Sequence, residues 1–161
     1  MENLKHEMAW LGINVLGISE TRWPGEDDYK IDGFRIIHSG GEESQRGVAI
    51  ILDKRTANCV EKVGCEGDRL LMVKLKGKLV DMCIIQVYTP TTEHSEEEGE
   101  DMYEKIKQLL DDETKSKDYT VVLGDFNTVV GEGKEDHYGL GYRNVCGQML
   151  RFLQKKTDVY R

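Results

Sequence analysis

The apolar residues of this sequence occur in short runs, and the length of these runs restricts the fold more than any other feature. The longest candidates, such as Gly47 to Leu52 and Tyr119 to Leu123, have the length of β-strands. No run approaches the roughly 18 apolar residues of a membrane-spanning helix, and the first residues lack the pattern of a secretory signal. We therefore expect a globular chain built on β-sheet, with no membrane segment.

Size and cysteine content restrict the class of protein further. A chain of 161 residues is expected to form one domain, here taken as residues 1–161. The four cysteines form no CxxC pair, and none has a histidine partner at the spacing of a zinc site. Cys83 and Cys146 fall in apolar segments, where a buried free thiol is expected. These features predict a reduced, intracellular protein without disulfides or a zinc site.

The order of the expected elements indicates a mixed α/β architecture. Helices are expected over residues 1–9 and 101–112 and after Asn144, a plausible N-cap. A glycine-rich loop over residues 131–141 leads to the last helix. Apolar patterns predict strands over residues 13–19, 34–38, 47–52, 70–73, 79–88 and 119–123. Hairpins early in the chain and a strand–helix–strand unit later predict a mixed sheet with flanking helices.

The negative charge is concentrated in one segment. Residues 93–118 hold 11 acidic and 4 basic residues, a net charge of −7, whereas the whole chain has a net charge of −8. Within this segment Met102, Ile106, Leu109 and Leu110 share one face of the expected helix. A solvated acidic helix face is the simplest interpretation. Such a face repels a phosphate backbone, so any nucleic acid is expected to dock elsewhere.

Two apolar strands end in carboxylates, which makes those strand ends candidates for a functional site. Glu20 follows the first of these strands, and Asp125 with Asn127 follows the strand that begins at Tyr119. In open α/β sheets the site lies at the carboxyl ends of strands, and carboxylate oxygens suit Mg²⁺. Gly124 would let another group approach the backbone closely. The alternative is that Glu20 and Asp125 merely cap loops.

A further strand end supplies Tyr88, whose phenol can hydrogen-bond a phosphate; the alternative is a half-buried strand aromatic. The candidate segments occur in an order that resembles the endonuclease/exonuclease/phosphatase superfamily. These are Leu16-Gly-Ile-Ser-Glu20-Thr-Arg-Trp23, Gly47-Val-Ala-Ile50, Gln86-Val-Tyr88-Thr-Pro90 and Gly124-Asp-Phe-Asn127. The later segment Gly139-Leu-Gly-Tyr-Arg-Asn-Val-Cys-Gly147 is similar to the endonuclease domain of RTE/BovB-type non-LTR retrotransposons and of related craniofacial development protein 2-like proteins.

The resemblance implies a function for each matched residue. Glu20 would be the ligand of Mg²⁺, and Tyr88 would contact the scissile phosphate. Asp125 would orient or deprotonate the attacking water, and Asn127 would help to position the water and the phosphate. The implied chemistry is metal-assisted hydrolysis of a DNA phosphodiester.

The resemblance also implies an incomplete endonuclease/exonuclease/phosphatase-like domain, built as a mixed β-sheet sandwich with flanking helices. Arg69 and Asn144 are weaker candidates for contacts with the nucleic-acid backbone; a surface charge and a helix cap are the alternatives. Missing strands would leave exposed sheet edges that can pair with a protein partner.

The departures from the family pattern concern both ends of the chain. Family members begin with another strand that carries an Asn, and they end with an Asp and a Ser-Asp-His motif, which this sequence lacks. The chain's own histidines, His6, His38, His94 and His137, are expected at the surface or in loops. Loss of the catalytic histidine predicts weak or absent activity, because an acid–base partner typically contributes about 10²–10⁴ in rate.

Three functions are therefore compatible with the sequence. The first is a Mg²⁺-dependent DNA endonuclease domain of retrotransposon origin, weakened by the absent motifs. The second is a domesticated remnant that no longer cuts and acts as a protein-interaction module. The third is a phosphatase-like member that acts on a small phosphoester. A nuclear location follows only from the resemblance.

Overall fold

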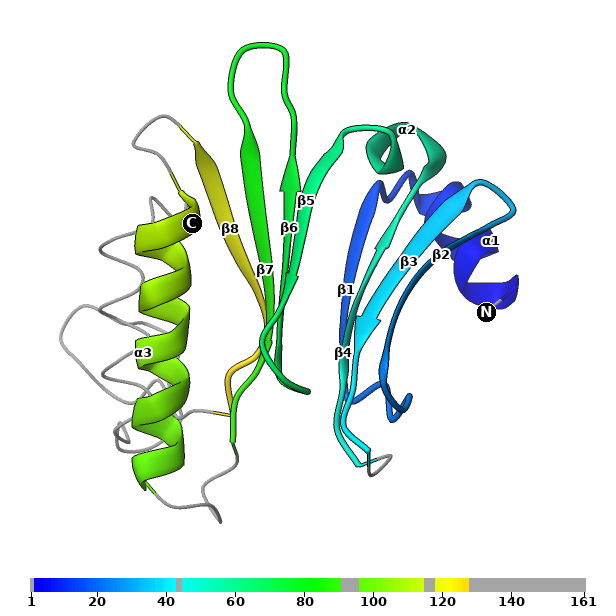
Figure 1. Ribbon diagram of the computed structural model, residues 1–161. Coiled ribbons are helices and arrows are strands. Elements are labelled where there is room, and N and C mark those ends of the chain that lie inside the picture. Colours follow the sequence, from blue (N-terminus) through cyan, green and yellow to red (C-terminus); the bar gives the residue numbers. More distant parts are fainter. Residues whose placement is uncertain (1, 43–44, 91–95, 115–117, 128–161) are drawn as a thin grey trace, which may run out of the picture. The chain divides into compact units, whose positions relative to one another are not determined.

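The computed structural model describes residues 2–42, 45–90, 96–114 and 118–127 (Figure 1). Contacts divide the described residues into two compact units. Unit 1 comprises residues 2–42, 45–88 and 118–124, and unit 2 comprises residues 89–90, 96–114 and 125–127. The predicted loop at 131–141 and the helix after Asn144, with Cys146, His94 and His137, lie outside the described residues. The single domain over residues 1–161 stays a prediction.

The first sheet of unit 1 has four antiparallel strands in the order β1-β4-β3-β2. These strands are β1 (Val15–Ser19), β2 (Glu26–Ile31), β3 (Phe34–Ser39) and β4 (Val48–Leu52). The central strand β4 is buried at all five positions, as its uninterrupted apolar sequence predicts. The strands expected over residues 13–19, 34–38 and 47–52 are thus confirmed.

The second sheet has the order β5-β6-β7-β8. Its strands are β5 (Val60–Cys65), β6 (Leu70–Leu75), β7 (Met82–Tyr88) and β8 (Tyr119–Asp125). The first three are antiparallel neighbours. The expected hairpin is confirmed as β6 and β7, although Leu79, expected in the strand, lies in the connecting turn and is 98% exposed.

Strand β8 runs parallel to β7. The Tyr119 backbone N–H donates to the Asp81 carbonyl oxygen, and the Thr89 N–H donates to the Asp125 carbonyl oxygen, both at 2.9 Å. These two bonds join the beginnings and the ends of the strands. A parallel neighbour needs a crossover connection, which here contains α3 (Glu96–Glu113).

An apolar core lies between the two sheets of unit 1 (Figure 1). It combines alternate residues of β4, β6 and β7 with neighbours from the other strands. Its buried members are Ile37, Val48, Ile50, Leu52, Ala57, Leu71, Val73, Leu75, Ile84 and Tyr88. Two short helices complete unit 1: α1 (Glu2–Leu11) packs Met8 on the outer face of the first sheet, and α2 (Lys54–Ala57) is capped by Asp53.

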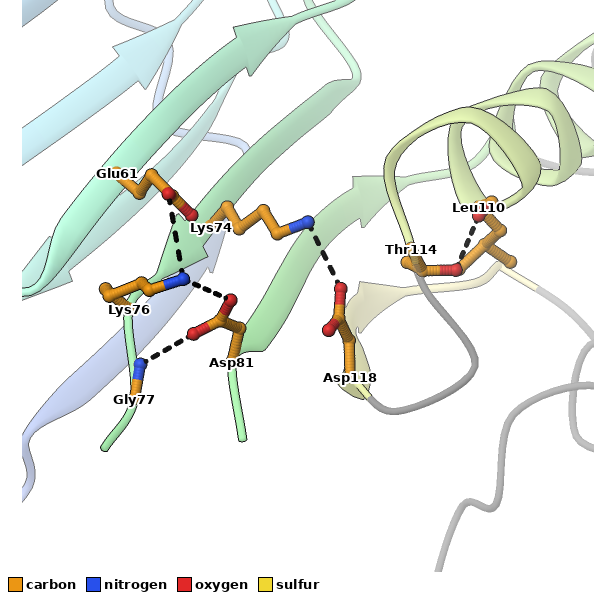
Figure 2. A network of polar contacts seen from close by, with 8 residues as sticks. All are labelled: Glu61, Lys74, Lys76, Gly77, Asp81, Leu110, Thr114 and Asp118. Carbon is orange, nitrogen blue, oxygen red and sulfur yellow. Dashed lines mark hydrogen bonds and ion pairs between the residues drawn. The ribbon is translucent and has the colours of Figure 1, made fainter. Parts of the chain in front are cut away.

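Helix α3 confirms the expected acidic helix and corrects its buried face. Met102, Ile106 and Leu110 are buried as predicted, but Tyr103 joins them and Leu109 is partly exposed. The buried face of α3 therefore includes Tyr103 in place of Leu109. At the end of the helix the Thr114 hydroxyl donates to the Leu110 carbonyl oxygen at 2.5 Å (Figure 2).

Strand β2 and its hairpin with β3 were not predicted. The turn between them is Asp32-Gly33, with φ of +51° and +86°, as a two-residue type I′ hairpin requires. Asp28 of β2 accepts two hydrogen bonds from the Arg35 guanidinium, at 2.8 and 2.6 Å. This ion pair lowers the pKa of Asp28. Ion pairing thus supports a strand whose composition gives little β signal.

The expectation that His38 is a surface or loop residue is wrong. His38 lies in β3 and is 7% exposed. The rings of Trp23 and Tyr29 meet it edge-on, with centroids 5.3 and 6.4 Å away. The two aromatic rings cover the outer face of the first sheet here, so a polar residue is buried there. His6 is exposed, and Cys83 is buried, as expected.

Gly124 is needed for β8 to approach β7. Its φ is +141°, and a Cβ at this position would lie 1.9 Å from the Val87 carbonyl oxygen. We predict that Gly124→Ala lowers the free energy of unfolding by about 3 kcal/mol, because the backbone must move. Urea unfolding followed by circular dichroism measures the loss. The matched control is Gly67→Ala, where φ is +66° but no atom lies within 4 Å; equal losses in the two variants would contradict the steric explanation.

A buried ion pair ties β6 to the residue that precedes β8 (Figure 2). Lys74 Nζ lies 3.1 Å from Asp118 Oδ2, and the two side chains are 11% and 6% exposed. The hydrogen bond to Asp118 raises the pKa of Lys74. Removal of one member of such a pair leaves a desolvated charge without its counter-charge.

We predict that Asp118→Ala costs about 3 kcal/mol of unfolding free energy and that adding Lys74→Met restores most of the loss. Thermal and urea unfolding of the two variants measure this. Glu104→Ala is the matched control, because it removes an exposed pair with Lys107 at 3.5 Å and is expected to cost under about 0.5 kcal/mol. A double variant that is no more stable than Asp118→Ala would argue against desolvation of Lys74 as the cause.

Candidate functional site

Glu20 and Tyr88, two of the residues proposed from the sequence, meet in unit 1. Glu20 directly follows β1 of the first sheet, and Tyr88 is the last residue of β7 in the second sheet. The Tyr88 hydroxyl donates a hydrogen bond to Glu20 Oε1 at 2.5 Å. Tyr88 is buried, with only 7% of its surface exposed. The fold thus joins two strand ends that are far apart in the sequence.

Arg69 forms the other side of this cluster. Its backbone carbonyl accepts from the Tyr88 N–H at 2.9 Å, and its Nη1 donates to the Tyr88 carbonyl oxygen at 3.3 Å. The guanidinium carbon lies 5.2 Å from the centroid of the Tyr88 ring, within the range of a cation–π contact. Arg69 is only 8% exposed, so the alternative of a surface charge is wrong. Tyr88 lies between a cation and a carboxylate.

The Glu20 carboxylate combines one fixed oxygen with access to solvent. Oε1 accepts from Tyr88, whereas Oε2 lies 3.8 Å from Arg22 Nη2 and the side chain is 47% exposed. Mg²⁺ typically binds one or two protein carboxylates and keeps several waters, and a half-exposed carboxylate fits that requirement. Within the described residues, no group of three His, Cys, Asp or Glu side chains is placed to hold a metal.

Asp125 and Asn127 form a second cluster, in unit 2. The Asn127 backbone N–H donates to Asp125 Oδ1 at 3.0 Å, and its side-chain Nδ2 donates to the Thr89 carbonyl oxygen at 2.8 Å. Asp125 therefore caps the turn after β8, which is the structural alternative that the sequence analysis considered for this residue. Its side chain is also exposed, so the carboxylate is accessible to water.

Backbone conformation sets two of these residues apart. Glu20 has φ of +55° and Asn127 has φ of +39°, a left-handed conformation that is uncommon for residues other than glycine. Such strain costs about 1–3 kcal/mol and tends to occur at functional sites. Arg22 and Asp32 adopt the same conformation, so it accompanies tight turns of this backbone as well as the candidate residues.

Sequence reasoning missed two polar residues beside the Glu20–Tyr88 pair. Gln86 Nε2 donates to Ser19 Oγ at 2.9 Å, and Ser19 Oγ donates to the Val87 carbonyl oxygen at 3.1 Å. The period of two along a strand places Gln86 on the same face as Tyr88, which was the available signal. The predicted convergence of Glu20 with Asp125 and Asn127 stays a prediction.

The chain has curated relatives that share its sequence over most of its length. No protein-family model matches the sequence. Craniofacial development protein 2 of Bos taurus is 34% identical over 155 residues, and that of Tragulus javanicus is 33% identical over 155 residues; each match covers 93% of this chain. This chain is a homologue of craniofacial development protein 2. It spans about a quarter of these relatives, 26% and 27% of their lengths.

Solved structures with a similar fold include two endonucleases. The endonuclease domain of TRAS1, a telomere-specific non-LTR retrotransposon, matches with a TM-score of 0.63 and 16% identity over 95% of this chain and 62% of its own. The AP endonuclease LMAP from Leishmania major matches with a TM-score of 0.65 and 14% identity over 96% of this chain and 60% of its own.

A third structure, D. rerio TDP2 complexed with single-strand DNA product, has a TM-score of 0.53 and 12% identity, and covers 78% of this chain and 52% of its own. The chain shares the endonuclease/exonuclease/phosphatase fold of these structures, as the sequence predicted. No helix among its described residues is long and apolar enough to cross a membrane.

The Glu20–Tyr88 hydrogen bond is expected to appear as a measurable coupling. In a double-mutant cycle of Glu20→Gln and Tyr88→Phe, we predict a coupling of about 1 kcal/mol in unfolding free energy. This value is below that of a buried hydrogen bond to a charged group, because solvent screens the half-exposed Glu20. Urea unfolding of the four proteins measures it. Tyr29→Phe is the control for hydroxyl loss, because Tyr29 is a partly buried strand tyrosine whose ring packs edge-on against His38. Additive single effects would show that the bond does not form in solution.

Proposed function

We propose that this chain is a Mg²⁺-dependent DNA endonuclease-like domain of retrotransposon origin that hydrolyses phosphodiester bonds. The observation that carries the proposal is the hydrogen bond between Tyr88 and the half-exposed Glu20 carboxylate. The endonuclease/exonuclease/phosphatase fold, found also in the TRAS1 endonuclease domain and in the LMAP AP endonuclease, supports it. The structure of TDP2 with a single-strand DNA product supports DNA as the substrate class.

Glu20 is the residue that we assign to Mg²⁺. Its free coordination capacity lies on Oε2, because Oε1 accepts from Tyr88. When bound there, Mg²⁺ would supply positive charge beside the phosphate oxygens. Without substrate, the Tyr88 hydroxyl donates to the Glu20 carboxylate and orients it. Because the phenol has a single proton to donate, we assign it to the scissile phosphate in exchange for the Glu20 contact. Arg69, stacked on the ring, restricts the movement of Tyr88.

Asp125 and Asn127 are assigned to the attacking water. The exposed Asp125 carboxylate can accept a proton from water, and the Asn127 backbone N–H, which donates to Oδ1, holds the carboxylate in place. The hydrogen bond from Nδ2 to Thr89 holds the Asn127 side chain in place. In this assignment Asp125 orients or deprotonates the water, and Asn127 positions it.

The charge of α3 restricts where DNA can bind. Within Glu96–Glu113, nine residues are acidic and two are basic. Repulsion between this helix and a phosphate backbone places bound DNA on another surface of the chain. A nuclear location and a retrotransposon origin belong to the same proposal.

Nicking of supercoiled plasmid by the 161-residue chain tests the proposal. We predict slow nicking that requires Mg²⁺, stops on addition of EDTA, and falls by about 10²–10⁴ in Asp125→Ala. The matched control is Asp101→Ala, an exposed carboxylate of α3, which is expected to leave the rate unchanged. Agarose electrophoresis of timed samples measures the rate.

Absence of nicking by a chain that circular dichroism shows to be folded would overturn the catalytic assignment. That result would favour the second function considered from the sequence, a non-catalytic remnant that acts as a protein-interaction module. Nicking that persists at full rate in Asp125→Ala would instead point to a contaminating nuclease or to a different catalytic residue.

A further inference from the structure

A chain of two polar contacts crosses the apolar core of unit 1 beside the candidate site. Gln86 lies on β7 and is 1% exposed. Its Nε2 donates to Ser19 Oγ in the first sheet at 2.9 Å. Ser19 Oγ in turn donates to the Val87 carbonyl oxygen of the second sheet at 3.1 Å. The contacts thus run from the second sheet to the first and back.

These contacts adjoin the two residues that form the Glu20–Tyr88 pair. Ser19 directly precedes Glu20, and Val87 directly precedes Tyr88. Ser19, the last residue of β1, and Glu20, which follows it, are therefore both bonded to the end of β7. Ser19 is bonded to Gln86, and Glu20 is bonded to the Tyr88 hydroxyl. Such a double connection limits both the separation and the rotation of the two strand ends.

The sequence of β1 makes room for Gln86. A Cβ on Gly17 would lie 1.9 Å from Gln86 Oε1 and 2.9 Å from its Cδ. A larger residue in β1 would therefore displace the Gln86 side chain. The glycine and the glutamine fit each other across the core.

Core packing alone does not explain a glutamine at this position. Gln86 Oε1 is buried with no hydrogen-bond partner, and a buried polar atom without a partner reduces stability. An apolar residue of similar volume would avoid that cost. What Gln86 contributes is the donation from Nε2 to Ser19 Oγ, with a longer contact of 3.5 Å to the Val87 carbonyl oxygen.

We propose that Gln86 is a positioning residue that acts through Ser19 to hold the Glu20 carboxylate against the Tyr88 hydroxyl. The proposal rests on Glu20 and Tyr88 being the site pair of the proposed function. It does not require the chain to cut DNA, because it concerns the geometry of the pair.

The test follows the Tyr88 ring by NMR in chain labelled with ¹³Cζ-tyrosine, with Tyr88→Phe to assign the resonance. All samples are kept at one pH. Glu20→Gln replaces the carboxylate that accepts from the Tyr88 hydroxyl and is expected to shift the Tyr88 resonance. Gln86→Leu and Ser19→Ala are expected to shift it most of the way to its position in Glu20→Gln. Ser19→Thr, which keeps the hydroxyl, is expected to leave it at its position in the unaltered chain.

Ile84→Val is the matched control, because Ile84 is a core residue of the same strand, 2% exposed, that takes no part in the bridge. It is expected to leave the Tyr88 resonance at its position in the unaltered chain. Far-UV circular dichroism verifies that each variant is folded. Ser19→Ala removes a single oxygen atom, so it decides the question if Gln86→Leu does not fold.

A Tyr88 resonance in Ser19→Ala that coincides with that of the unaltered chain would overturn the proposal and leave Gln86 as a residue that only fills the core. A Tyr88 resonance that Glu20→Gln does not shift would overturn it as well. The plasmid assay separates this inference from the proposed function. A shifted Tyr88 resonance in Ser19→Ala, in a chain that does not nick DNA, supports the positioning of the pair and rejects catalysis alone.

Discussion

Packing between the two sheets of unit 1 fixes the distance on which the Glu20–Tyr88 contact depends. Core residues such as Ile50, Val73 and Ile84 are 0–2% exposed. Burial of each aliphatic side chain of this kind stabilises the fold by about 1.5–3 kcal/mol, whereas the half-exposed tyrosine–carboxylate bond contributes about 1 kcal/mol. The apolar core therefore sets the separation of the sheets, and the polar contact forms because the core has already placed the strand ends.

Strand register gives the same packing its specificity. Leu71 pairs with Gln86, and Leu70 pairs with Val87. A slip of one residue in β7 would exchange its two faces, moving Gln86 and Tyr88 out of the space between the sheets. The same slip would move Ile84 out of the core between the sheets and break the bonds of Gln86 to Ser19 and of Tyr88 to Glu20. The inward position of the two polar side chains therefore depends on the register of β7.

The parts of the fold that the sequence predicted are those that follow from local patterns. Strands β4 and β6 are apolar runs, so their burial could be read from composition and length. Strand β2 has four charged residues and lies at a sheet edge, where such residues remain solvated, so it carries little hydrophobic signal. Only the Asp32-Gly33 turn indicated it. The burial of His38 depends on aromatic residues brought over β3 by the fold, and no local pattern contains that information.

The candidate site shows the same division between local and long-range information. Glu20, Tyr88 and Asp125 were found because each ends an apolar strand. Arg69 and Ser19 were not assigned securely, because their partners come from other strands. Glycines provided a signal for close approach: Gly17 leaves room for Gln86, and Gly124 leaves room for the Val87 carbonyl. An isolated glycine within a strand pattern indicates such close contact. In this fold Gly17 and Gly124 therefore mark the places where polar groups come close to the residues of the candidate site.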